Sequence, residues 1–175
     1  MTTTLALLAL TAFQQEVTFS MGAHGGGDKT TNAAWQANYS LGLRKGEKAS
    51  LFGEVHLLAS PNRKNKITNP LGSRDEAALF VTPGLRVSFW AKERLSPFVT
   101  GGFGLGVYEQ SALLQNGAPF PGSRSTNHGA VQFGGGLDVR TLNWLAFRGD
   151  FRNFYSGGRH NPTVSIGFQL RFGER

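Results

Sequence analysis

Apolar and polar residues alternate along most of the chain with a period of two. In residues 164–172 one parity holds Ser165, Gly167, Gln169 and Arg171, and the other holds only large hydrocarbon side chains. Residues two apart lie on the same face of a β-strand, so this strand would separate an apolar medium from a polar one. The same alternation predicts eight strands, at residues 16–22, 33–43, 49–58, 76–90, 97–109, 130–141, 144–154 and 164–172.

The connections between these predicted strands alternate between long and short. The long connections are 23–32, 59–75, 110–129 and 155–161, and the short ones are 44–48, 91–96 and 142–143. Bacterial outer-membrane barrels have short turns on the periplasmic side and long loops on the outside. The pattern therefore predicts an all-β fold, an eight-stranded antiparallel up-and-down transmembrane β-barrel.

Alternation alone does not say which face of the wall points inward. A soluble lipocalin-like barrel, the second alternative, would enclose its hydrocarbon and expose its charges. All six lysines lie outside the predicted strands, whereas a solvated outer wall would carry lysine freely. Charged strand residues are mostly arginines and acids, and the planar arginine fork suits a confined hydrogen-bond network. We therefore predict a lipid-facing apolar wall and a lumen charge network of Glu54, Arg86, Glu109, Asp138, Arg140, Arg148, Asp150, Arg152 and Arg171.

The composition agrees with a membrane barrel without requiring one. The 175 residues suit one domain, and no apolar run approaches the length of a membrane helix. A barrel spreads its membrane signal over every second residue, so the mean hydropathy of -0.23 does not exclude it. The net charge of +7 fits either a solvated basic surface or contact with anionic lipid. The residues predicted for contact with lipopolysaccharide phosphates are Arg63, Lys64, Lys66, Arg74, Arg124 and Arg159.

The first thirteen residues have part of the pattern of an export signal. Residues 5–12 form a short apolar stretch without alternation, followed by polar Gln14 and Gln15. No Lys or Arg precedes this stretch, so we expect an atypical or truncated signal peptide at 1–13. A first apolar strand is the alternative interpretation. With a signal peptide at 1–13, residues 14–175 form the predicted barrel domain.

The end of the chain resembles the small outer-membrane β-barrel family of the OmpA/OmpX-like eight-stranded type. Ser165, Gly167, Leu170 and Phe172 match the family's C-terminal assembly signal of a polar residue, a glycine, an apolar residue and an aromatic residue. The resemblance covers about residues 14–172 and implies a monomeric barrel in the outer membrane of a Gram-negative cell. It also implies insertion by the barrel-assembly machinery, a structural or interaction role, contact with lipid and lipopolysaccharide, and no nucleic-acid partner.

No catalytic motif stands out from the sequence. His128 with Ser125, or His160 with Ser156 and Asp150, contain the residue types of a nucleophile, a base and an acid. Such sets arise readily by chance in a loop-rich chain. The resemblance makes a lipid A-modifying barrel enzyme the first alternative, but its deacylase members carry a His-any-Ser triplet that this sequence lacks. No cluster has metal-ligand spacing, and we expect no metal and no cofactor.

Overall fold

The computed structural model describes residues 14–25, 31–68, 71–110, 113–115, 118–120 and 124–173, with the backbone alone over much of 62–75 and 113–124. No helix among them is long and apolar enough to span a membrane. The predicted signal peptide at 1–13 lies outside the described residues. The strands are β1 Gln15–Gly25, β2 Thr31–Arg44, β3 Ala49–Thr68, β4 Leu71–Phe89, β5 Leu95–Gln110, β6 Leu113–Gln115, β7 Ala118–Phe120, β8 Arg124–Leu142, β9 Leu145–Ser156 and β10 Arg159–Phe172.

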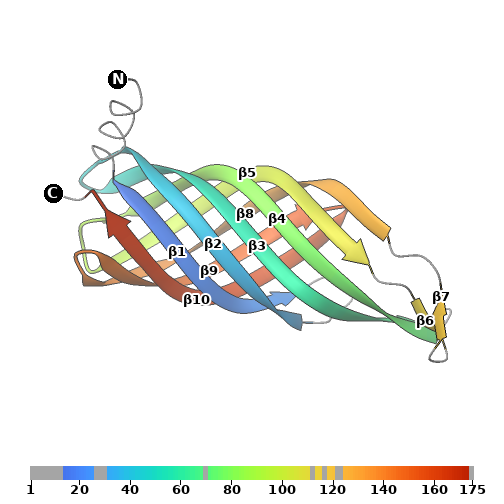
Figure 1. The fold of residues 1–175 in the computed structure, drawn as a ribbon. Helices are drawn as coiled ribbons and strands as arrows, with labels where there is room; N and C mark the ends of the chain where they lie inside the picture. Colours follow the sequence, from blue (N-terminus) through green and yellow to red (C-terminus); the bar gives the residue numbers. More distant parts are fainter. Residues whose placement is uncertain are drawn as a thin grey trace, which may run out of the picture.

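Eight of these strands form one closed antiparallel barrel (Figure 1). Each strand pairs with the neighbours that an up-and-down order requires, and β1 pairs with β10 to close the wall. The strands β6 and β7 form a short hairpin within the β5–β8 connection, and its Leu114 pairs with Ser73 of β4. The fold class predicted from the alternating pattern is confirmed.

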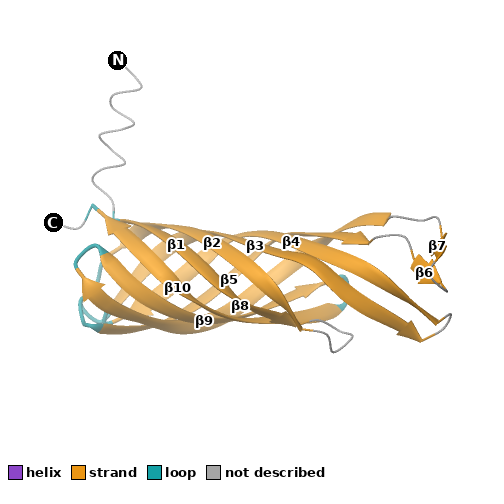
Figure 2. Cartoon of the chain, turned by 60° about the horizontal axis from the view of Figure 1, so that its bottom comes forward, coloured by secondary structure: helices purple, strands orange, loops and turns teal. Residues whose placement is uncertain are grey.

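The hairpin of β3 and β4 reaches far beyond the rest of the barrel (Figure 2). Residues 59–75, predicted as a long connection, continue both strands until Thr68 pairs with Leu71. Lys64 and Lys66 therefore lie in a strand, which corrects the prediction that no strand carries lysine. A hairpin beyond the membrane has water on both faces, so its sequence does not need to alternate.

The two faces of the wall have opposite chemistry. Large apolar side chains stand exposed on the outside along every strand of the barrel, up to 74% for Phe103 and 72% for Ile166. The side chains of the other parity are buried inside and are mostly polar or charged. Aromatic side chains gather at the short-turn end, as in the aromatic girdle of outer-membrane barrels: Phe89, Trp90, Trp144 and Phe172 are all exposed there. The wall therefore has the surface of a barrel that contacts hydrocarbon.

Candidate functional site: the charged half of the lumen

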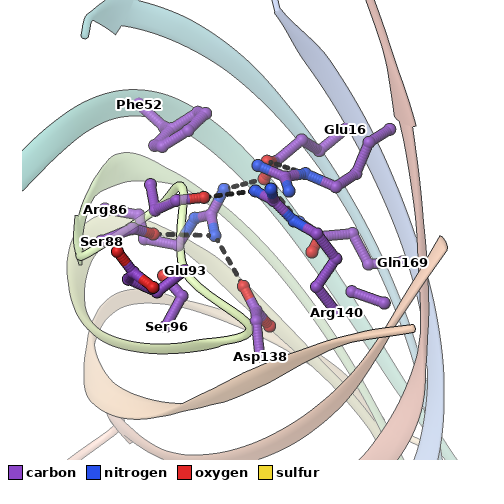
Figure 3. A pocket seen from close by; sticks show the side chains of 12 residues that line it. Glu16, Phe52, Arg86, Ser88, Glu93, Ser96, Asp138, Arg140 and Gln169 are labelled. Carbon is purple, nitrogen blue, oxygen red and sulfur yellow. Dashed lines mark hydrogen bonds and ion pairs between the residues drawn. The ribbon is translucent and has the colours of Figure 1, made fainter. Parts of the chain in front are cut away.

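Arg86 lies at the centre of the lumen half that is nearest the short turns. It comes from β4, and its guanidinium lies between carboxylates from three other strands. Two of them, Glu16 and Asp138, are drawn in Figure 3. It pairs with Glu16, its Nη1 lies 3.3 Å from Asp138 Oδ2, and its Nε lies 3.4 Å from Glu54 Oε2. Only 1% of its surface is exposed. One arginine therefore ties together β1, β3, β4 and β8 across the barrel.

Two further arginines extend the network along β9. Arg148 makes a bidentate pair with Asp138, with distances of 2.6 Å from Nε to Oδ1 and 2.8 Å from Nη2 to Oδ2. Arg152 donates from Nη1 to Glu54 Oε1 at 2.6 Å and from Nε to Asp150 Oδ2 at 2.9 Å. Paired, charge-assisted bonds of this kind are stronger than neutral ones and fix the orientation of the fork.

Glu16 is the carboxylate that links the network to the two ends of the chain. It accepts bonds from Arg86, from the Gln169 side-chain amide and, at 3.2 Å, from Arg171 Nε. Its side chain is 2% exposed. Glu16 is missing from the residues predicted for the lumen, although it lies on the parity opposite to Val17 and begins the first strand. Its position opposite to Val17 in the alternating pattern was the sequence signal that could have placed Glu16 inside the barrel.

Two predicted members of the network are placed elsewhere. Glu109 is exposed on the outer wall, because its neighbour Tyr108 takes the inward position, so its assignment to the lumen is corrected. Arg140 is half-buried at the rim and donates to the carbonyl oxygens of Ala91 and Lys92 in the turn after β4. These two hydrogen bonds hold the turn after β4 closed.

Aromatic rings cover the arginines and fill the remaining space. The Arg86 guanidinium carbon lies 4.3 Å from the centre of the Phe52 ring, and that of Arg148 lies 4.5 Å from the Phe98 ring. Glycines of the facing strand leave room for this packing, since a Cβ at Gly136 would lie 2.7 Å from Phe98 Cζ. The pocket between Glu16, Arg86 and Asp138 has a free volume of about 10 Å³, which is at the lower limit for one water molecule.

The network balances its charge inside the barrel. Four arginines (Arg86, Arg148, Arg152 and Arg171) form ion pairs with four carboxylates (Glu16, Glu54, Asp138 and Asp150). Burying an unpaired charge costs several kcal/mol, whereas a fully paired set avoids most of that cost. Each of these eight buried charges therefore has a partner of opposite sign.

The outer half of the lumen is filled differently. Phe80 packs against Phe154 at 4.8 Å and edge-on against Tyr108 at 5.6 Å between ring centres, beside the buried Leu58. Some polar groups there bond to one another, for example His56 Nε2 with the Gln36 side-chain oxygen at 2.8 Å. Neither Phe80 nor Phe154 is among the residues that the sequence predicted for the lumen.

The candidate catalytic residues are not assembled into one site. Asp150 is engaged by Arg152 and lies six residues from Ser156 along β9, a separation of about 20 Å in an extended strand. His160 Nδ1 lies 2.7 Å from the Asn153 side-chain nitrogen. His128 and Ser156 do line a small cavity of about 100 Å³ at the outer mouth, and Ser125 is exposed. Among the described residues, no group of three or more His, Asp or Glu side chains is arranged to hold a metal.

The residues of the predicted assembly signal all lie in β10. Ser165 is buried in the lumen, Leu170 is half-buried and Phe172 is exposed at the short-turn end. A Cβ at Gly167 would collide with the Phe19 carbonyl oxygen of β1, so this position keeps the closing strands close together.

The predicted contact residues for lipopolysaccharide lie at the outer end. The backbone of Arg63, Lys64, Lys66 and Arg74 belongs to the β3–β4 extension, and their side chains lie outside the description. Arg124 begins β8, and Arg159 is exposed at the start of β10.

Solved structures share this fold. Ail of Yersinia pestis, in complex with the heparin analogue sucrose octasulfate, matches with a TM-score of 0.63 and 16% identity, over 91% of this chain and 99% of that one. Neisserial surface protein A matches at 0.60 and 11%, over 92% of this chain and 97% of that one. The N-terminal barrel of Pseudomonas aeruginosa OprF matches at 0.58 and 9%, over 91% and 97%. No family model and no curated protein matches the sequence.

The chain has the fold of the small eight-stranded outer-membrane barrels. The sequence identities with these three structures are 9% to 16%, so the similarity is one of fold alone.

Proposed function

We propose that this chain is an integral, monomeric barrel of the outer membrane of a Gram-negative cell, with a structural or interaction role and a closed lumen. The single observation that supports a closed lumen is the paired cluster around Arg86, with about 10 Å³ of free space beside it. Because every charge in it has a partner, opening a path for ions would require several ion pairs to break together. Such a barrel would interact with other molecules through its outer wall and its outer loops, and not through a pore.

Planar-bilayer recording on the purified protein tests the closed lumen. We expect no steady porin-like conductance and at most brief, small events as neighbouring ion pairs exchange partners. A large and stable ion-selective conductance would contradict the proposal.

Cell fractionation tests the location. The protein should require detergent for extraction, and unboiled protein should migrate differently from boiled protein, because a closed barrel has no free edge at which to unravel. Recovery in the soluble periplasmic fraction would contradict an outer-membrane barrel.

The outer loops carry the interaction part of the proposal. Arg63, Lys64, Lys66, Arg74, Arg124 and Arg159 concentrate positive charge at the outer end, where they would meet lipopolysaccharide phosphates. The heparin analogue bound to Ail is an example of a polyanion on a barrel of this fold. Lipid A mass profiles with and without the protein should be identical, and a change in acylation would instead favour the lipid A-modifying enzyme.

Recognition of β10 by the barrel-assembly machinery is a further part of the proposal. Phe172 is 52% exposed, so its loss costs little packing inside the barrel. Replacement of Phe172 by alanine should nevertheless leave precursor in the periplasm and reduce the folded barrel in the membrane. The control is Phe168→Ala, which removes a similarly exposed ring of the same strand at a position where the signal accepts any residue. Equal membrane levels of both variants would contradict a specific role of Phe172.

A further inference from the structure

An apolar groove runs across the outer wall near its outer end. The paired residues Trp35, Ala59, Leu79 and Val107 form one row across β2, β3, β4 and β5. Ala59 stands between the larger Trp35 and Leu79, so the surface is hollowed at its position. The neighbouring Pro61 and Ala77 are also small, and together these side chains line a cavity of about 310 Å³ with a mostly apolar surface.

A second, smaller cavity continues on the other side of Trp35. The same row extends from Trp35 to Met21 of β1 and from Met21 to Ile166 of β10. Phe19, Met21, Ile166 and Phe168 line this cavity of about 160 Å³ with Trp35. The indole is 58% exposed and therefore forms a ridge with an apolar hollow on each side.

The position of the two hollows determines what can fill them. They lie on the wall that carries the exposed apolar side chains, so hydrocarbon chains of the surrounding lipid are the neighbours available to cover them. Two separate hollows beside one ridge fit a lipid with several acyl chains better than a lipid with a single chain.

The strands that form the larger hollow continue directly into the basic hairpin. Between Pro61 and Ala77, residues 62–76 contain four basic residues (Arg63, Lys64, Lys66 and Arg74) and two acids (Asp75 and Glu76). A lipid seated in the hollow would therefore carry its headgroup toward a segment with a net charge of about +2, which attracts phosphate. The exposed carboxylate of Glu109 lines the same hollow and can accept hydrogen bonds from headgroup hydroxyls.

We propose that the grooves beside Trp35 are a specific binding site for a phosphorylated, multi-acyl glycolipid of the outer leaflet, of the lipid A type. The acyl chains lie on both sides of Trp35, and the phosphates face the β3–β4 hairpin. This inference rests on the proposed outer-membrane location and adds to it a defined site on one side of the barrel.

Fluorescence of Trp35 in vesicles tests the site. Phenylalanine replaces Trp90 and Trp144 at the opposite end, so that Trp35 is the single tryptophan. The barrel is inserted into vesicles of brominated phosphatidylcholine, which quenches tryptophan on contact, and unlabelled lipid A is then added in increasing mole fraction. We expect lipid A to displace the quencher from Trp35 about tenfold more effectively than its mole fraction predicts. A single-tryptophan variant that keeps Trp144 should show no such preference.

Two sets of variants separate the parts of the site. Ala59→Leu with Ala77→Leu fills the larger hollow and should abolish the preference. Ala37→Leu is the matched control, since it makes the same change on β2 outside both cavities, and should retain it. Lys64→Gln with Lys66→Gln should lower the preference severalfold by weakening the attraction for phosphate.

Three outcomes would overturn the inference. Quenching that follows mole fraction for every lipid would mean ordinary boundary lipid. Displacement by phosphatidylglycerol as effective as that by lipid A would mean a general anionic-lipid surface, and an equal preference at Trp144 would mean no defined site. A wild-type barrel that inserts with heat-modifiable migration but shows no preference refutes this site alone, whereas failure to insert refutes the proposed function.

Discussion

The half of the lumen near the short turns and the half near the outer mouth are filled by side chains of different chemistry. Near the short turns, Arg86 and its neighbours fill the space with paired charges that reach across the barrel. Toward the outer mouth, Phe80, Phe154 and Leu58 fill it with hydrocarbon, and neutral groups such as His56 bond to nearby amides. The first half is held by pairing and the second by packing.

This difference predicts how each half responds to damage. An ion pair that loses one partner leaves a buried charge without compensation, so a single change in the charged half spreads to every group that shares the network. An aromatic side chain that is shortened leaves a cavity, and the cost stays with its own neighbours. The charged half should therefore be the more sensitive half, and the part that controls ion passage.

The largest effect is expected from Asp138→Ala. Asp138 accepts bonds from both Arg148 and Arg86, so its removal strands positive charge in the lumen. We expect the free energy of unfolding to fall by about 3–5 kcal/mol, measured by denaturant titration in lipid. Combining it with Arg148→Met removes the stranded charge and should recover part of the loss. A loss below about 1 kcal/mol, the size typical of an exposed pair, would contradict the network.

The alternating pattern identified the barrel and most of its charged lumen residues, because lipid and lumen demand opposite side chains at every step along a strand. The two errors lie at the ends of strands, where few residues remain to define the alternation. Glu16 was left out at the start of β1, and Glu109 was assigned inward although Tyr108 occupies the inward parity.

The aromatic filling of the outer half could not be predicted from residue type. Phe80 and Phe154 share the parity of polar lumen residues, but their hydrocarbon suggests lipid contact when each is considered alone. The β3–β4 extension was also unpredictable, because outside the membrane no medium imposes an alternating pattern on a strand. The groove beside Trp35 depends on which small and large residues are paired across strands, and register cannot be deduced from one strand at a time.

A smaller effect is expected from Phe154→Ala in the outer half. Its ring packs against Phe80 at 4.8 Å and lies 5.5 Å from the His56 ring, so its loss leaves a buried cavity. We expect a destabilisation of about 3 kcal/mol in the same titration. Position 154 lies six residues from Arg148 on β9, about 20 Å away along the strand, so the effects of Phe154→Ala and Asp138→Ala should add within about 0.5 kcal/mol. Strong coupling between them would mean that the two halves form one unit.

The smallest effect on stability is expected from two Phe→Leu changes, one in each half of the lumen. Together they test which half keeps the lumen closed. Phe52→Leu removes the ring that lies over Arg86, and Phe80→Leu removes a ring whose described aromatic contacts are the rings of His24, Tyr108 and Phe154. Each should cost about 1 kcal/mol, from a lost cation–π contact in the first case and lost ring–ring contacts in the second. Only Phe52→Leu should increase the frequency of brief conductance events in a planar bilayer, because it frees Arg86 to exchange between Glu16, Glu54 and Asp138. If Phe80→Leu increased them equally, closure would depend on packing throughout the lumen, and the charged half would have no special part in it.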